Sequence, residues 1–449
     1  MSRLMVIVMV LAGTVGPVRG DDWPQWLGPK RDGVWREQGT IDRFPAEGPK
    51  VKWRVPVGGG YAGAAVAAGR VFVMDRQEKG ERPKDAFDRN ARPGIERVLC
   101  LNEKDGKEIW KHEYAVPYTV SYGSGPRVTP TVDGERVYTL GAEGHLICFN
   151  VSDGKIVWEK KLVGPTPLWG YSGHPLVDGD RLFVLTSGAE GAITAFDKNN
   201  GEQIWTALPV RDPGYAPPMV YEAGGTKQLI VWHPQSVNSL DPATGKVHWT
   251  QPFGPVQNGV SIPTPMKTGD LLFISSAWDG GLMMKLDDDE PKATVAWKRG
   301  GRPGSKVTDA LHALMATPVI QDEHIYGVCA MGELRCLKLE NGERVWETFA
   351  ATVPNGEKTM WATAFLTPNG EESGVKFFIA NEHGELIIAR LTPKGYEELS
   401  RAKLLEPTNK DAGRPVVWCH PAYANRSVYW RNDREFVCVS LGREQTAGK

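Results

Sequence analysis

The segment Asp105-Gly-Lys-Glu-Ile-Trp110 is the clearest copy of a pattern that recurs along the whole chain, a tight turn followed by a strand that ends in tryptophan. In each full copy, a glycine stands four residues before the tryptophan. The recurring tryptophans are Trp53, Trp110, Trp158, Trp205, Trp249, Trp297 and Trp346, and a weaker last copy runs from Gly395 to Leu399. Trp53 has no such turn before it, and the turn before Trp297 lacks the glycine. The chain therefore holds eight copies, spaced roughly every 50 residues.

A repeat of this length with four strands per unit is typical of a β-propeller blade. In the unit that ends at Trp158, we expect strands over 128–132, 136–140, 146–150 and 156–160. The second strands are almost continuously apolar, as in 182–185 (LFVL), which is expected when both faces of a sheet are covered. A single blade cannot cover both of its own faces. The sequence therefore predicts an all-β, eight-bladed β-propeller of four-stranded antiparallel blades over residues 51–441.

The two ends of the chain are expected to close the ring. Residues 51–57 supply a lone fourth strand that contains Trp53, and its three partner strands must come from 416–440. Pairing the N-terminal strand with the C-terminal unit covers edges that an open sheet would expose. The recurring tryptophans are predicted to be structural and to pack between neighbouring blades. Residues 442–449 are expected to form a disordered tail.

The turn-strand pattern with its tryptophan resembles the docking motif of the PQQ-like (quinoprotein dehydrogenase-like) eight-bladed propellers. The opening segment Trp23-Pro-Gln-Trp26-Leu-Gly28-Pro-Lys-Arg31-Asp32-Gly33 is similar to the start of many bacterial PQQ-repeat propellers of unassigned function. That superfamily includes the PQQ-dependent alcohol dehydrogenases and the cofactor-free BamB family, which acts in outer-membrane protein assembly. The resemblance is specific for the fold and leaves the activity open.

Residues 1–20 are predicted to be a secretory signal, because an arginine at position 3 precedes an apolar run over 4–15 and small residues suited to cleavage. The mature protein is then periplasmic or secreted. The cleavage region has no cysteine, so the lipid anchor that the resemblance to the assembly-factor lipoproteins implies is missing. Residues 21–50 are irregular, and we expect them to form a strap across the propeller.

The formal net charge of −1 gives no basic field for nucleic acid, and no membrane span is expected in the mature chain. We expect a monomer. Four of the six cysteines, Cys100, Cys148, Cys336 and Cys438, occupy the same place in the third strand of their units. They are interpreted as small buried hydrophobic residues, because equivalent positions in different blades are too far apart for most disulfides. Cys329 and Cys419 lie outside this register, and no haem-binding motif is present.

The longer connections, from fourth to first strand and from second to third strand, share one face of the ring, called here the long-loop face. Binding residues are expected on it. The candidates are Tyr61, Tyr122, Trp169, Tyr171, His174, Tyr215, Arg302, His312, Trp361, Trp418 and His420. Such an aromatic mouth would suit a planar or sugar-like ligand. Alternatively, the aromatic residues only pin the loops and the histidines are hydrogen-bonded core groups.

Two charged segments of this face have open interpretations. Arg299, Arg302 and Lys306 could meet an anionic ligand or form a solvated loop. The charged insert over 76–97 in the first blade could be a lid or a mobile loop.

Chemistry with PQQ would require a Ca²⁺ ion held by oxygen ligands and an aspartate that acts as general base. The nearest acidic candidates are Asp279, Asp309 and Glu382, which fit turn or surface roles equally well. The vicinal disulfide of many alcohol dehydrogenases in the superfamily is also missing. We therefore predict no catalytic residue, no metal site and no cofactor, with PQQ and Ca²⁺ kept for the alternative below.

The sequence thus favours an exported binding or protein-interaction scaffold without catalysis. Its partner, a protein or a small molecule, would bind on the long-loop face. The alternative is a PQQ-dependent dehydrogenase that oxidises alcohols or sugars.

Overall fold

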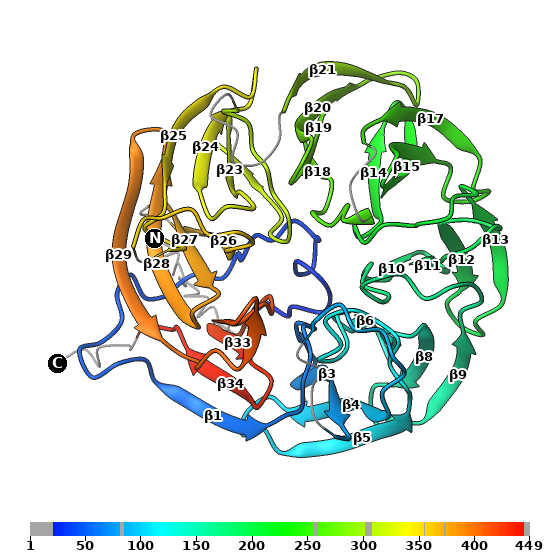
Figure 1. Cartoon of the computed structure of the whole chain (residues 1–449), viewed down its shortest axis with the longest axis horizontal. Helices are drawn as coiled ribbons and strands as arrows, with labels where there is room; N and C mark the ends of the chain where they lie inside the picture. The colour runs from blue at the N-terminus through cyan, green and yellow to red at the C-terminus, as the bar shows by residue number, and fades with distance from the viewer. Residues whose placement is uncertain are drawn as a thin grey trace, which may run out of the picture.

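The computed structural model describes residues 21–80, 85–254, 259–300, 308–353, 355–371 and 374–443. These residues form eight four-stranded antiparallel sheets and one two-stranded hairpin, and they contain no α-helix. Figure 1 shows the sheets as blades arranged around a central axis. The predicted eight-bladed propeller is confirmed. The predicted signal sequence over 1–20 lies outside the described residues.

Blades 1 to 7 each use four consecutive strands, and blade 8 combines the two ends of the chain. Blade 1 consists of β2 (Ala65–Ala67), β3 (Arg70–Glu78), β4 (Gly94–Asn102) and β5 (Glu108–Ala115), and blade 2 of β6 (Thr131–Asp133), β7 (Arg136–Leu140), β8 (His145–Asn150) and β9 (Ile156–Lys161). Blade 3 consists of β10 (Leu176–Asp178), β11 (Arg181–Leu185), β12 (Ile193–Asp197) and β13 (Gln203–Ala207), and blade 4 of β14 (Met219–Ala223), β15 (Thr226–His233), β16 (Ser236–Leu240) and β17 (Val247–Pro252). Blade 5 consists of β18 (Met266–Thr268), β19 (Leu271–Ser276), β20 (Gly280–Leu286) and β21 (Ala293–Arg299), and blade 6 of β22 (Val319–Gln321), β23 (His324–Val328), β24 (Leu334–Lys338) and β25 (Arg344–Thr348). Blade 7 consists of β26 (Ala364–Glu371), β27 (Gly374–Asn381), β28 (Glu385–Thr392) and β29 (Gly395–Lys403). Blade 8 is β32 (Ala422–Ala424), β33 (Ser427–Arg431), β34 (Glu435–Ser440) and β1 (Val51–Pro56).

The first strands begin later than the sequence pattern predicted. The strand expected over 128–132 is β6, which covers Thr131–Asp133. A proline directly precedes the first strand in six blades, at Pro130, Pro175, Pro218, Pro265, Pro318 and Pro421. Because proline has no N–H to donate to the ladder, regular pairing starts after it.

The ring closes as predicted, since β1 pairs antiparallel with β34 and Trp53 lies opposite Cys438. The three partner strands of β1 lie within 416–440, as predicted, and β30 (Asn409–Asp411) and β31 (Arg414–Val416) form a separate hairpin before them. Gly442 and Arg443 were expected to be disordered. Instead, Gly442 bridges Thr40, and Arg443 N donates to Gly39 O at 2.8 Å, so the strap orders the first residues after the last blade.

Six of the seven recurring tryptophans donate their indole N–H to a neighbouring blade. The indole N–H of Trp110, for example, donates to Val151 O at 3.0 Å in blade 2. The glycine of each full turn contacts the tryptophan of the preceding blade: a Cβ at Gly154 would lie 2.5 Å from the Trp110 ring. Trp249 is the exception, since it donates to Gln228 Oε1 of its own blade at 2.9 Å. The following turn, before Trp297, is the one without the glycine.

Replacing Gly154 with alanine should therefore cost more stability than the same change at Gly134. Both glycines have positive φ, 69° and 56°, but a Cβ at Gly134 would have no neighbour within 4 Å. Left-handed strain alone costs about 1–2 kcal/mol, and the clash with Trp110 should add about 1–3 kcal/mol. Urea denaturation of both variants measures the difference. Equal losses would show that the turn does not need to admit the indole ring.

The cysteines fit the same docking geometry. Cys100, Cys148, Cys336 and Cys438 each lie opposite a docking tryptophan on the neighbouring strand of their own sheet. All six cysteines are free and buried. Their predicted role as small core residues is consistent with this position, because a larger side chain would compete with the indole ring for space.

The strap passes through the centre of the ring (Figure 1). Trp23 exchanges backbone hydrogen bonds with Val66 of blade 1, and Trp35 bridges Asn369 of blade 7. Between these contacts, the chain turns at Leu27 and Arg31, both at positive φ, and its tip approaches the starts of the first strands of blades 3 and 4. The strap therefore fills the channel and leaves its tip facing the long-loop side.

Candidate functional site

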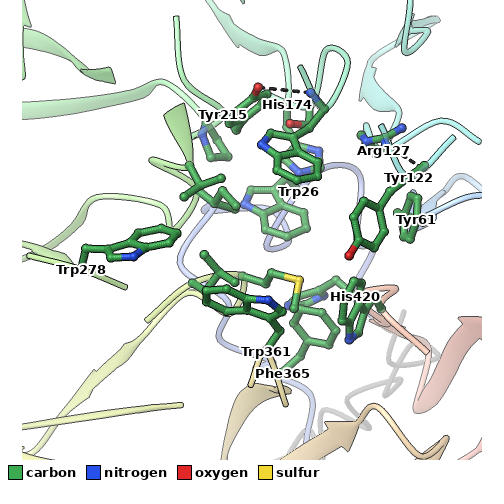
Figure 2. A pocket seen from close by; sticks show the side chains of 18 of the residues that line it. Trp26, Tyr61, Tyr122, Arg127, His174, Tyr215, Trp278, Trp361, Phe365 and His420 are labelled. Carbon is green, nitrogen blue, oxygen red and sulfur yellow. Dashed lines mark hydrogen bonds between the residues drawn. The ribbon is translucent and has the colours of Figure 1, made fainter. Parts of the chain in front are cut away.

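Eight of the eleven predicted residues line one cavity of about 270 Å³ on the long-loop face (Figure 2). They are Tyr61, Tyr122, Trp169, His174, Tyr215, Trp361, Trp418 and His420. They come from the connections that lead into the first strands of the blades. Since these strands are the innermost of each blade, residues far apart in sequence converge at the axis.

The cavity also contains residues that the sequence analysis missed. Trp26 comes from the strap, Phe87 from the insert of blade 1, Trp278 from the connection between β19 and β20, and Phe365 from the start of β26. Arg127 also lines it, as do the smaller or aliphatic residues Ser172, Pro217, Val260, Ile262, Leu314 and Met315. Phe87 and Trp278 lie on connections from the second to the third strand, and such connections were predicted to lie on the long-loop face. Trp26 precedes the first repeat, so the repeat pattern gave no signal for it.

Two of the remaining three candidates, Tyr171 and His312, are described and do not line it. Tyr171 is buried between blades 2 and 3, and its hydroxyl lies 2.8 Å from Ser187 Oγ. His312 is buried, and its Nδ1 lies 3.1 Å from Ala277 O. This agrees with the alternative that the histidines are hydrogen-bonded core groups. Arg302 and Lys306 lie outside the described residues.

Aromatic side chains contact one another around the cavity. Tyr122 lies at the centre of one group, with ring centroids 5.7 Å from Phe87, 5.5 Å from Trp169 and 6.0 Å from Trp418. On another side, Trp278 and Trp361 are 5.7 Å apart. These contacts hold the rings in fixed orientations, so their flat faces form rigid walls.

Trp26 occupies the middle of this arrangement (Figure 2). Its ring stacks on His174 at 3.9 Å between centroids with an interplanar angle of 7°, and meets His420 edge-on at 4.9 Å. The indole N–H donates to Thr264 Oγ1 at 3.0 Å. Three blades thus hold the tip of the strap, which serves as the floor of the cavity.

The two histidines are neutral and have defined tautomers. His174 Nδ1 accepts the N–H of Thr129 at 2.9 Å, so its proton is on Nε2. His420 Nδ1 lies 2.7 Å from Pro421 O, which can only accept, so its proton is on Nδ1. Burial lowers the pKa of His174 well below its usual value and that of His420 to about 4.

Two cavity aromatics have a strained backbone. Tyr122 has φ 51° and Trp361 has φ 64°, in the left-handed region that bulky residues rarely adopt. Each N–H donates to a carbonyl at 2.6 Å, that of Ala86 for Tyr122 and that of Ala330 for Trp361. Strain of this kind persists only where the surroundings enforce it, and it concentrates at functional sites. Its presence at two wall residues supports the choice of this cavity.

Arg127 is the only residue of the described cavity lining that carries a formal charge at neutral pH. Its guanidinium lies over the Tyr61 ring, 5.1 Å from the centroid. It donates to Ser121 O at 2.7 Å, Tyr122 O at 2.8 Å and Gly125 O at 2.9 Å. Backbone carbonyls therefore position this cation, and no carboxylate among the described residues pairs with it.

A family model described as outer membrane protein assembly factor BamB matches residues 95–348 and 189–402. The chain belongs to this family. The BamB structure from Moraxella catarrhalis is 16% identical, with a TM-score of 0.52, and the match covers 81% of this chain and 99% of that one. This likeness confirms the predicted PQQ-like propeller fold. No curated protein matches the sequence.

Two quinohemoprotein alcohol dehydrogenases are more distantly similar. The enzyme ADHIIG from Pseudomonas putida HK5 is 11% identical with a TM-score of 0.47, covering 95% of this chain and 81% of that one. The enzyme from Comamonas testosteroni is 12% identical with a TM-score of 0.46, covering 95% and 82%.

The acidic candidates Asp279, Asp309 and Glu382 lie outside the described lining of the cavity. No Asp or Glu is among the residues described as lining the cavity. Glu382 accepts from Trp418 Nε1 at 3.0 Å and pairs with Arg414 at 3.1 Å, while Asp309 pairs with Arg299 at 3.0 Å. Asp279 accepts from Ser276 Oγ at 3.1 Å. In the part of the chain that the structure describes, no group of three or more His, Cys, Asp or Glu could hold a metal ion.

A search of the described residues for a helix that is long and apolar enough to cross a membrane found none.

Proposed function

We propose that this BamB-family propeller is an exported scaffold, periplasmic or secreted, that binds a partner on its long-loop face without catalysing a reaction. The aromatic cavity is the observation that carries the proposal. Aromatic contacts fix its walls, two wall residues have a strained backbone, and the only formal charge in its described lining is that of Arg127. A site for nucleophilic catalysis would need a nucleophile and a base in contact. Among the described residues, the cavity histidines bond to backbone groups instead.

The rim of the cavity suggests that the bound surface extends outwards. Phe87 is 54% exposed and Met360, beside Trp361, is 55% exposed. Large apolar side chains that continue an apolar cavity to the surface mark interaction sites. A protein partner would cover this rim, and the family description, outer membrane protein assembly factor, supports a role in protein interaction.

Site-specific photocrosslinking in an exporting bacterium tests which face binds. A photoreactive amino acid at Met360 should give discrete covalent adducts with a partner protein, because this exposed residue is next to Trp361 on a connection of the long-loop face. The matched control is Lys155, whose side chain is 79% exposed in the turn between β8 and β9 on the opposite face. We expect no adduct there. Equal adducts at both positions, or adducts only at Lys155, would contradict the proposal.

The dehydrogenase alternative predicts a different result. Purified mature protein is titrated with PQQ, with and without Ca²⁺, while tryptophan fluorescence and the thermal midpoint are followed. Because the described lining of the cavity offers no carboxylate for the ion, we expect no saturable, Ca²⁺-dependent response. Such a response would contradict the scaffold proposal and direct attention to alcohol and sugar substrates.

A further inference from the structure

The cavity walls would suit two kinds of ligand, because the faces of Trp and Tyr rings attract cations and also stack on aromatic rings. The surrounding charges decide between them. We propose that the cavity binds a flat aromatic ring that carries an anionic group, with the ring against the aromatic walls and the anion at Arg127. This inference rests on the proposed function, since it names the class of ligand that the same cavity takes.

Arg127 provides the first part of the argument. Its hydrogen bonds to Ser121, Tyr122 and Gly125 go to carbonyl oxygens, which are neutral and supply no counter-charge at the wall. Guanidinium groups bind carboxylates through charge-assisted hydrogen bonds that are stronger than neutral ones. Figure 2 shows Arg127 beside Tyr122 and Tyr61, with Trp26 towards the centre. A ring on Trp26 could therefore direct a carboxylate to Arg127.

A second cation lies beneath the floor. Arg31, only 4% exposed, donates to Pro175 O at 3.0 Å and His174 O at 3.1 Å. No carboxylate in the described part of the chain pairs with it. Burial lowers its pKa to about 9, so it keeps its proton at neutral pH. Its charge adds to that of Arg127, and both oppose a cationic ligand.

The nearby carboxylates do not reverse this field within the cavity. Asp411 accepts the Tyr122 hydroxyl at 2.8 Å and pairs with Arg414 at 3.3 Å, and Glu382 also pairs with Arg414. Asp433 accepts from Gly60 N at 3.0 Å. These acids lie behind the walls and are bonded there, whereas Arg127 lines the cavity itself. An anion is therefore favoured over a cation.

The walls also favour an aromatic ring over a sugar. A sugar presents many hydroxyl groups, each of which needs a polar partner when it is buried. Apart from the tyrosine hydroxyls, the indole N–H groups and Arg127, the described lining offers the ring nitrogens of His174 and His420 and the hydroxyl of Ser172. The rest of the lining is apolar, including Val260, Ile262 and Leu314. A flat apolar ring buries its surface there without leaving polar groups unpaired.

Isothermal titration with three probes of the same shape tests the charge preference. The probes are 2-naphthoate, the neutral 2-naphthamide and the cationic 2-naphthylmethylammonium, each titrated into the mature protein at neutral pH. We expect 2-naphthoate to bind about tenfold or more tightly than the amide, because a hydrogen bond to a charged group is stronger. The cation should bind most weakly. Tightest binding of the cation, or no binding of any probe, would overturn the inference.

Variants of Arg127 separate its charge from a structural role in its loop. Arg127→Met should abolish the preference for 2-naphthoate over 2-naphthamide, while Arg127→Lys should retain most of it. Arg89→Met is the control, because Arg89 also donates to a carbonyl, Thr119 O at 2.7 Å, but does not line the cavity. It should leave the preference unchanged. If Arg127→Met weakens both ligands equally, Arg127 only shapes the loop and the inference fails.

The crosslinking result at Met360 is independent of these titrations. Adducts at Met360 without binding of any naphthyl probe would leave the scaffold proposal standing and reject the aromatic anion. Binding of 2-naphthoate without adducts would support the anion site and reject a protein partner on this rim.

Discussion

Trp53→Ala is expected to lower the free energy of unfolding by about 3–5 kcal/mol, the cost of removing a buried tryptophan. Trp53 is on β1, the strand that closes the ring, and only 7% of its surface is exposed. Its indole N–H donates to Glu103 O of blade 1 at 2.8 Å, and its ring lies 5.4 Å from that of Phe436 within blade 8. The variant therefore weakens both the closing sheet and its contact with the next blade.

Trp249→Ala provides the matched comparison. Trp249 is the docking tryptophan that bonds within its own blade, and it is less buried than Trp53. Its removal should cost clearly less. Urea denaturation of the two variants and the wild type gives the free energies and the m-values. If Trp249→Ala costs as much as Trp53→Ala, closure of the ring has no special dependence on the N-terminal strand.

The second large effect is expected at Glu96 in β4, a buried acid that joins blade 1 to the loops of the cavity. Its carboxylate accepts the hydroxyls of Tyr114 and Tyr118 and the N–H of Ala142, the last at 3.0 Å. Arg76 lies over the Tyr118 ring, 4.0 Å from its centroid. The Tyr118 loop continues to Tyr122 and Arg127, so Glu96 also supports one wall of the cavity.

Glu96→Ala should cost about 3–5 kcal/mol, because three buried donors lose their acceptor and each unmet donor costs about 1–3 kcal/mol, with partial relaxation. Glu96→Gln keeps one acceptor oxygen and should cost less. Equilibrium denaturation measures both. A loss below about 1 kcal/mol for Glu96→Ala would contradict a supporting role for this carboxyl group.

The stability difference between wild type and Glu96→Gln should also depend on pH. Burial raises the pKa of Glu96, while its hydrogen bonds to Tyr114 and Tyr118 lower it in part. The folded protein therefore holds this proton more tightly than the unfolded chain, whose glutamate pKa is about 4.3. The contribution of Glu96 is complete below that value and is lost as the pH rises through the folded pKa. A difference that grows with pH would contradict this assignment.

The sequence predicted the fold in detail because the determinants are local and repeated. The spacing of Trp110, Trp158 and Trp205 was enough for the blade count, and the unpaired strand at Trp53 was enough for the closure. The starts of the first strands were placed too early, as at 128–132, because the apolar pattern runs through the proline that limits pairing. Trp249 keeps the pattern but donates its indole N–H within its own blade, and the turn that follows it lacks the glycine.

The cavity could be predicted only in part. Aromatic residues before the first strands, such as Tyr122 and Trp418, share a position in the repeat, so the repeat brings them together. Trp26 has no repeat position, and its place under His174 depends on how the strap turns at Leu27 and Arg31. Tyr171 and His312 had suitable positions but face the interior, because side-chain direction at loop ends is not fixed by spacing.

A crystal structure of the mature protein with 2-naphthoate would test most directly whether the long-loop cavity is the binding site. We predict the naphthyl ring between the aromatic walls above Trp26, with a carboxylate oxygen at about 2.7–2.9 Å from the Arg127 guanidinium. A well-occupied ligand at any other place on the propeller, or a cavity left empty at a saturating ligand concentration, would contradict the assignment.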